Sequence, residues 1–191
     1  MTLLLIGLVL FLGVHSVRIV AEGWRGHTIQ RLGEGPWKGL YSLLSLAGFA
    51  LIVWGYGAAR MQPVVLWAPP LWTRHLAALL TLPAFVLLVA AYVPGNSLKA
   101  RLRHPMVLGV KTWALAHLIA NHTLADLLLF GAFLVWGLLD FRAARQRDRR
   151  LNVLYPPGHV GPTVVTVVVG TVAWAAFAFW AHAPLIGVRP F

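Results

Sequence analysis

Cysteine is absent from the chain of 191 residues. This absence excludes disulfide bonds, thiolate metal ligands, covalent c-type haem attachment and cysteine nucleophiles together. Charged residues make up only 11% of the sequence, against about 25% in soluble domains, and hydrophobic residues make up 59%. Only five residues are acidic, which leaves little material for chemistry by paired carboxylates. The composition therefore indicates a membrane protein.

Motifs of soluble enzymes and of nucleic-acid-binding proteins are also missing. Serine, histidine and acidic residues form no nucleophile-elbow pattern, and no glycine-rich phosphate loop follows a strand. The formal net charge of +11 comes from basic residues that lie between apolar runs, not along one stripe or in a recognisable module. We therefore expect no nucleic-acid partner and assign the positive charge to membrane topology.

Apolar windows predict an all-α, polytopic integral membrane helix bundle with about six spans, in a single domain over residues 1–191. The predicted spans cover residues 2–20, 38–59, 71–93, 105–120, 123–141 and 162–183. The fourth is short and meets the fifth at residues 121–122, so we expect these two to form a tight hairpin, leaving four or five full crossings. The first run lacks a basic n-region and a cleavage site, so we expect a retained helix, not a signal peptide.

Basic residues are distributed unevenly between the two sides of the membrane. The segments 21–37, 94–104 and 142–161, with their flanks, hold twelve of them, and the opposite side holds three. The twelve are Arg18, Arg25, Arg31, Lys38, Lys99, Arg101, Arg103, Arg142, Arg145, Arg147, Arg149 and Arg150, and the three are Arg60, Arg74 and Arg189. The positive-inside rule places the basic segments in the cytoplasm and both termini outside, in the periplasm of a bacterium. We interpret the charged run 142–150 as a topology determinant that touches anionic lipid.

Titratable side chains within or beside the spans are candidates for function, because they cost several kcal/mol in a bilayer unless they are partnered. These residues are His15, His75, His104, Lys111, His117, His122, Asp126 and His182. His122 is predicted to lie in a turn and His182 near the outer end of the last span, which favours structural roles. His75 is predicted in the first outer turn of the third span, as a solvated side chain or as a reserve ligand partnering His117.

His15 and His117 are the strongest candidates, and both are predicted inside spans. Apolar residues at helical spacings surround His15, and none of them satisfies its ring nitrogens. The small residues Gly109 and Ala114 near His117 would let a bulky group approach. With a rise of about 1.5 Å per residue, the two Cα levels differ by about 8 Å, which suits two imidazoles approaching a tilted ligand from opposite sides.

His104 and Lys111 are seven residues apart and thus nearly aligned on one helix face. His104 is predicted either to anchor an acidic group, such as a propionate or a lipid phosphate, or to lie solvated at a helix start. Lys111 is predicted to snorkel, to pair with Asp126 or Asp140, or to hold a ligand carboxylate.

Two intramembrane histidines on different helices, no cysteine and nine tryptophans make a b-type haem, with its iron held by His15 and His117, a reasonable hypothesis. Buried neutral imidazoles are suitable metal ligands.

The stretch from Leu102 to Asn121, with residues 124–140 behind it and Gly13-Val14-His15-Ser16 ahead of it, closely resembles the NnrU family. The likeness covers nearly the whole chain. It implies a multi-pass protein of the bacterial inner membrane, associated with denitrification and nitric oxide metabolism. The expected partners are the lipid bilayer and haem, together with either a nitrite or nitric oxide reductase or an apolar substrate.

The family is similar to 15-cis-zeta-carotene isomerase, a membrane enzyme that uses b-type haem. That similarity implies haem ligation by His15 and His117, through a His-Ser pattern in the first helix and a Leu-Ala-His pattern in a later one. The isomerase has a cysteine three residues before the later histidine, implicated in redox-linked ligand exchange. Ala114 stands at that position here, so the exchange is not implied for this chain.

A second resemblance, to isoprenylcysteine-type membrane methyltransferases, rests on Arg-His-Pro at residues 103–105 and on Gly109. Those enzymes also need a downstream element like Glu-Glu-x-Leu, and this chain has Asp148-Arg149-Arg150-Leu151 there, which disfavours methyl transfer. The leading hypothesis is thus a haem-binding membrane protein with a redox or nitric-oxide-linked role: electron carrier, gas sensor or haem-dependent isomerase. The alternative is a non-enzymatic accessory protein that assembles a nitrite or nitric oxide reductase.

Overall fold

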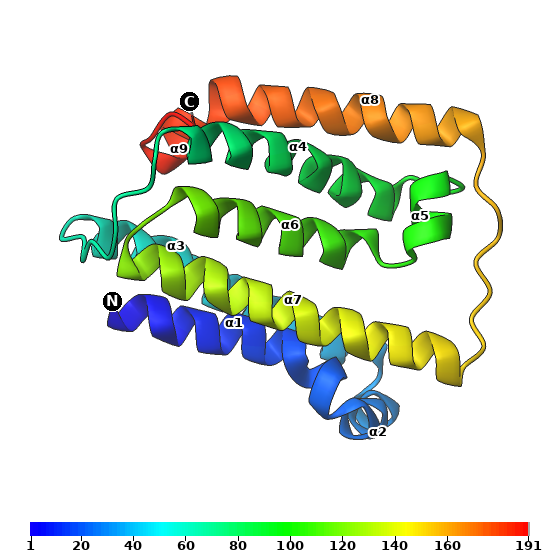
Figure 1. Ribbon diagram of the computed structural model, residues 1–191. Helices are drawn as coiled ribbons and strands as arrows, with labels where there is room; N and C mark the ends of the chain where they lie inside the picture. Colours follow the sequence, from blue (N-terminus) through cyan, green and yellow to red (C-terminus); the bar gives the residue numbers. More distant parts are fainter. Residues whose placement is uncertain (191) are drawn as a thin grey trace. The chain divides into compact units, whose positions relative to one another are not determined.

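Most of the chain forms long helices (Figure 1). The computed structural model describes residues 1–190. Within that range it has helices and two isolated β-bridges but no β-strands. The α-helices are α1 (Thr2–Val20), α2 (Glu22–Leu32), α3 (Glu34–Arg60), α4 (Trp72–Tyr92), α5 (Ser97–Leu102), α6 (Pro105–Ala120), α7 (Leu124–Arg150), α8 (Val160–Ala176) and α9 (His182–Ile186), with a π-helical turn η1 (Phe177–Ala181) before α9. The predicted all-α class is confirmed.

Five of these helical runs are long and apolar enough to cross a membrane: α1, α3, α4, α7 and the continuous run Val160–Ile186. The predicted short span is α6, whose 16 residues extend about 24 Å, less than the roughly 30 Å of a hydrocarbon core. The helical membrane character is therefore confirmed, whereas the number of full crossings and the side of the termini stay predictions.

Three segments predicted as loops contain helix. Helix α2 fills most of residues 21–37, α5 lies within residues 94–104, and α7 continues to Arg150 instead of ending at residue 141. Hydropathy falls after residue 141, but Ala143 and Ala144 favour helix, and arginines in the last turn interact favourably with the helix dipole. Hydropathy marks where the apolar surface ends, which is not where this helix ends.

The chain divides into two compact units. The first unit comprises Met1–Trp67 and His122–Asp140, and thus holds α1, α2, α3 and most of α7. The second unit comprises Ala68–Asn121 and the chain from Phe141 on, and holds α4, α5, α6, the end of α7 and all later helices.

In the first unit, α1 packs along α3, and glycines make the closest contacts. A Cβ atom on Gly7 would lie 2.6 Å from the backbone nitrogen of Ile52, and one on Gly48 would lie 2.8 Å from that of Phe11. Glycine at these positions therefore allows the close helix approach that is common in membrane proteins. The approach holds Phe11, and His15 one turn later, against α3.

The start of α7 is fixed by a capping arrangement in the first unit. The Oδ2 atom of Asp126 accepts hydrogen bonds from the backbone N–H of Thr123 at 2.9 Å and from its hydroxyl at 2.7 Å, while that hydroxyl accepts from the Asp126 N–H. The phenol of Tyr56 in α3 donates to the other carboxylate oxygen at 2.5 Å. Thr123 and Asp126 therefore form a reciprocal cap at the start of α7, and the buried Asp126 ties this helix to α3.

In the second unit, α4 lies between α6 and α8 (Figure 1). A Cβ atom on Gly170 of α8 would come within 2.6 Å of Val86 Cα in α4, so this contact also depends on glycine. Farther along the same pair, the indole N–H of Trp174 donates to the hydroxyl of Thr81 at 3.0 Å. Helix α6, which carries His117, packs along α4 as well.

Candidate functional site

The imidazole of His15 is held by its own helix. Its Nδ1 atom lies 2.7 Å from the carbonyl oxygen of Phe11, one turn earlier in α1. Because a carbonyl oxygen only accepts hydrogen bonds, Nδ1 carries the proton and donates it. In the neutral ring this assigns the lone pair to Nε2, the atom that can bind a metal ion.

Aromatic rings from three helices surround His15 in the first unit. Phe11 stacks on the imidazole with ring centroids 4.2 Å apart, Tyr41 of α3 lies at 5.3 Å, and Trp136 of α7 lies edge-on at 6.1 Å. The indole N–H of Trp136 is buried and has no hydrogen-bond partner within residues 1–190. Buried donors of this kind normally have an acceptor, so they are the sort of group that a bound molecule satisfies.

His117 repeats the arrangement of His15 in the second unit. Its Nδ1 atom lies 2.9 Å from the carbonyl oxygen of Trp113, one turn earlier in α6, and the two rings lie 5.2 Å apart. The same reasoning protonates Nδ1 and leaves the lone pair on Nε2. A histidine that binds a metal almost always donates its other N–H to a carbonyl or carboxylate, which fixes the ring and its tautomer.

His104 uses the opposite nitrogen and meets an acid from its own chain. As the residue that precedes α6, it places Nε2 2.8 Å from Oδ2 of Asp148 in the last part of α7. The hydroxyl of Tyr155 donates to the same oxygen at 3.1 Å. His104 thus lies at the predicted helix start, but its Nε2 contacts Asp148 of the same chain instead of a foreign acid or solvent.

Tyr155 lies in the connection between α7 and α8 and completes this cluster of side chains. Burial, followed by the hydrogen bond to Asp148, raises the pKa of Tyr155 above its ordinary value of 10.0. The guanidinium of Arg103 lies 5.4 Å from the centre of the Tyr155 ring, and the Arg103 backbone has a φ of 68°. The Arg-His-Pro motif therefore builds the joint between the start of α6 and the end of α7.

A sequence model of the family described as NnrU protein matches residues 3–190 of the chain. The chain belongs to the NnrU family. No curated protein and no solved structure matches it. The resemblance carried by the stretch around His117 is thereby confirmed, while the similarity to 15-cis-zeta-carotene isomerase stays a prediction.

In this NnrU chain, Lys111 contacts an aromatic ring. Its Nζ atom lies 4.7 Å from the ring centre of Phe141, which also presents its ring to His104 at 6.2 Å. A cation over a ring face is stabilised by the ring quadrupole, and the lysine stem stays half-buried on α6. Lys111 thus lies over Phe141, the same ring that faces His104.

The small residues of α6 serve packing in this NnrU protein. A Cβ atom on Gly109 would lie 2.9 Å from the carbonyl oxygen of Ala84 in α4, and Ala114 is 0% exposed. The prediction that Gly109 admits a bulky group is therefore wrong, because α4 itself makes the close approach. A cofactor at His117 has to approach from another side of α6.

The remaining histidine candidates are more exposed or held differently. His75 is exposed in the first turn of α4, and His122 lies in the connection before α7. The Nδ1 atom of His182 lies 2.7 Å from the carbonyl oxygen of Val188, in an exposed hydrogen bond of the C-terminal segment. Among residues 1–190, no three His, Asp or Glu side chains gather as a metal site of their own.

Sequence reasoning missed the residues that contact these histidines from other helices. The spacing of Phe11 and Trp113, four residues before each histidine, is visible in the sequence and could have indicated the carbonyl contacts. Trp136 and Asp148 lie far along the chain, and nothing local distinguishes them from a lipid-facing tryptophan and a solvated charge.

Proposed function

We propose that this NnrU-family membrane protein binds haem b, with His15 and His117 as iron ligands, and has a redox or nitric-oxide-linked role in the inner membrane. The observation that carries the proposal is the shared state of the two rings. Each donates Nδ1–H to the carbonyl four residues earlier, and each therefore has Nε2 as its ligating atom. His15 belongs to the first unit and His117 to the second.

The surroundings of His15 suit an apolar group with polar edges. Phe11 and Tyr41 provide aromatic faces, and the indole N–H of Trp136 provides a buried donor from which an oxygen atom could accept. Leaving such a donor without a partner costs about 1–3 kcal/mol, so its retention beside a candidate ligand favours a bound acceptor there. At His117, Trp113 supplies both the carbonyl and a neighbouring aromatic ring.

The cations proposed to receive the carboxylates of haem are now reduced to one. His104 binds Asp148, so Lys111 is the remaining candidate, with its charge held over Phe141. His75 stays the reserve iron ligand in the second unit, at an exposed position. Haem b, when bound, supplies an iron that can pass one electron or bind a diatomic gas.

Two roles from the resemblance differ in how well this chain supports them. A role as electron carrier or gas sensor requires only the two histidines and an apolar enclosure. The isomerase role rests on a ligand exchange by cysteine, and the corresponding Ala114 is a fully buried packing residue. Family membership and the five span-length helices fit a membrane protein of nitric oxide or nitrite metabolism.

The proposal is tested by assaying haem in the full-length protein, expressed with a haem supply and purified in mild detergent. The pyridine haemochromogen assay is expected to report haem b at close to one per chain. Protein that contains no haem b and co-purifies with a nitrite or nitric oxide reductase would instead establish the accessory role.

A further inference from the structure

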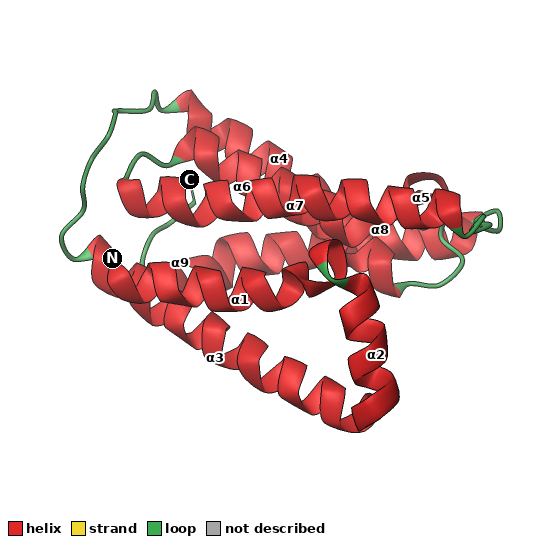
Figure 2. Ribbon diagram, turned by 90° about the horizontal axis from the view of Figure 1, so that it is seen from below, coloured by secondary structure: helices red, strands yellow, loops and turns green. Residues whose placement is uncertain are grey.

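Helix α2 connects two membrane spans and buries none of its residues. It leaves the end of α1 at a steep angle and joins it to α3 (Figure 2). Its 11 residues extend about 16 Å, too short to cross a bilayer. A helix of this length between two spans is placed at the membrane surface, where its side chains meet lipid headgroups.

The acidic residues of this region are already paired. Glu22 lies 4.0 Å from Arg18, and Glu34 lies 2.7 Å from Lys38. No other acidic residue occurs between residues 1 and 60. Arg31, by contrast, is exposed and forms no ion pair within the described residues 1–190. Both acidic residues of this region are already paired with other basic residues.

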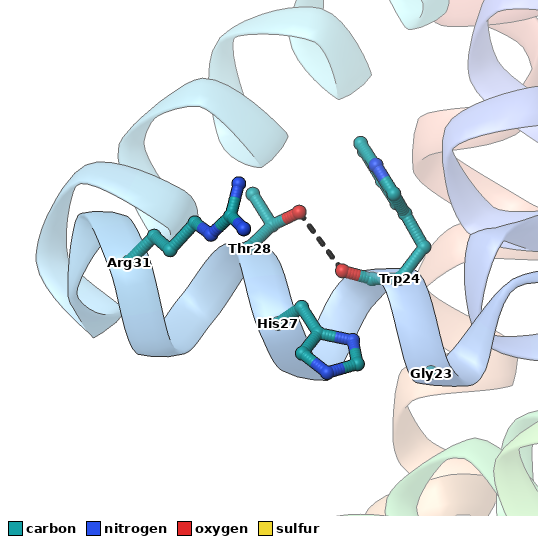
Figure 3. A pocket seen from close by; sticks show the side chains of 5 residues that line it. All are labelled: Gly23, Trp24, His27, Thr28 and Arg31. Atoms are coloured by element: carbon teal, nitrogen blue, oxygen red, sulfur yellow. Dashed lines mark hydrogen bonds between the residues drawn. The ribbon is translucent and has the colours of Figure 1, made fainter.

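Arg31 lies in a hollow on the surface of α2. The hollow has a volume of about 570 Å³ and is lined by Gly23, Trp24, His27, Thr28 and Arg31. Figure 3 shows Arg31 and Trp24 on either side of Thr28. The Thr28 hydroxyl donates to the carbonyl oxygen of Trp24 at 2.8 Å, and a Cβ atom on Gly23 would meet nothing within 4 Å.

We propose that this hollow binds the phosphate of an anionic phospholipid headgroup. The guanidinium of Arg31 has the charge and the donor geometry for a phosphate. Trp24 is 59% exposed and Leu32 53%, as suits side chains that enter the interface beside the headgroup. Charge complementarity favours an anionic lipid over a zwitterionic one, and the neighbouring spans favour a lipid over free phosphate.

The test measures lipid retained by the purified full-length protein, using native mass spectrometry with phosphatidylglycerol and phosphatidylcholine of equal chain length. Wild type should retain phosphatidylglycerol preferentially, and Arg31→Gln should weaken that retention about fivefold, as expected for one basic residue at a lipid surface. The matched control Arg74→Gln removes an exposed arginine from the start of α4 and should leave retention unchanged. Retention of phosphatidylcholine should not respond to either substitution.

Three results would overturn the proposal. One is an equal loss of phosphatidylglycerol in Arg31→Gln and Arg74→Gln, which would indicate attraction to net charge alone. Another is unchanged phosphatidylglycerol retention in Arg31→Gln. The third is displacement of the lipid by inorganic phosphate at comparable concentration, which would assign the hollow to a free anion.

Discussion

The Nε2 atom of His104 lies 2.8 Å from Oδ2 of Asp148, which joins the residue before α6 to the last turns of α7. The side chain of Asp148 is 8% exposed and that of His104 is 20% exposed, so this contact is shielded from water. It distinguishes His104 from His15 and His117, whose Nδ1 atoms lie beside carbonyl oxygens of their own helices and whose Nε2 atoms are the proposed iron ligands. The contact gives His104 a structural role between α6 and α7.

Replacing Asp148 by Asn should destabilise the second unit. The substitution exchanges a charge-assisted hydrogen bond for a neutral one, at a cost of about 2 kcal/mol, or about 5 °C in the midpoint of thermal unfolding. Differential scanning calorimetry of the detergent-solubilised protein measures this. Glu34→Gln breaks an ion pair whose side chains are 72% exposed and should have almost no effect. Equal midpoints for both variants would refute the structural role of Asp148.

Replacing Gly109 by Ala should also lower the unfolding midpoint. The new methyl group would lie 2.9 Å from the Ala84 carbonyl oxygen and force α6 away from α4, at a cost of about 1–3 kcal/mol. Gly57→Ala is the control, since a Cβ there meets nothing within 4 Å and alanine favours helix. A Gly109→Ala protein as stable as Gly57→Ala would contradict the packing of α6 on α4.

Replacing Trp136 by Phe tests whether the unpaired indole N–H binds an acceptor on haem or stays unpaired when haem is bound. The variant keeps an aromatic ring beside His15 and removes the buried N–H. Without haem, removing an unpaired donor should raise the free energy of unfolding by about 1–3 kcal/mol. With haem bound, the gain should shrink, because the N–H then has an acceptor. Equal gains in both forms would show that the indole does not serve the ligand.

Tyr155→Phe should change the response of stability to alkaline pH. The pKa of Tyr155 is raised in the folded protein, so its contribution to stability is complete below about pH 10 and is lost as pH rises above that value. The phenylalanine variant lacks this ionisation and should therefore lose less stability than wild type as the pH rises from about 9 to about 12. Parallel stability curves for the two proteins would contradict the assignment.

The sequence predicted the spans well because hydropathy is a local property. Windows of about 20 apolar residues located α1, α3, α4 and α6, and positive charge located the segments between them. The fifth span was predicted to end at residue 141, where the apolar residues end, but α7 continues to Arg150. A helix can extend beyond its apolar residues, so hydropathy reports the end of the apolar surface and not the end of the helix.

The site was predictable only in part. His15 and His117 were identified because an ionisable group inside a span is costly whatever surrounds it. Their carbonyl contacts follow from helix geometry, but the rings of Trp136 and Tyr41 arrive from other helices. His104 was assigned the wrong partner because Asp148, 44 residues later, belonged to a run that looked like solvated charge. Long-range pairing of this kind is decided by packing, which one sequence does not display.

The central claim is that His15 and His117 ligate haem b, and the absorption spectrum of the purified protein with its histidine variants tests it most directly. Wild type should show a Soret band, and His15→Ala and His117→Ala should each shift or abolish it. His159→Ala, at an exposed position before α8, should leave the spectrum unchanged. A wild-type protein with no Soret band after expression with adequate haem, or a band that neither substitution alters, would contradict the account.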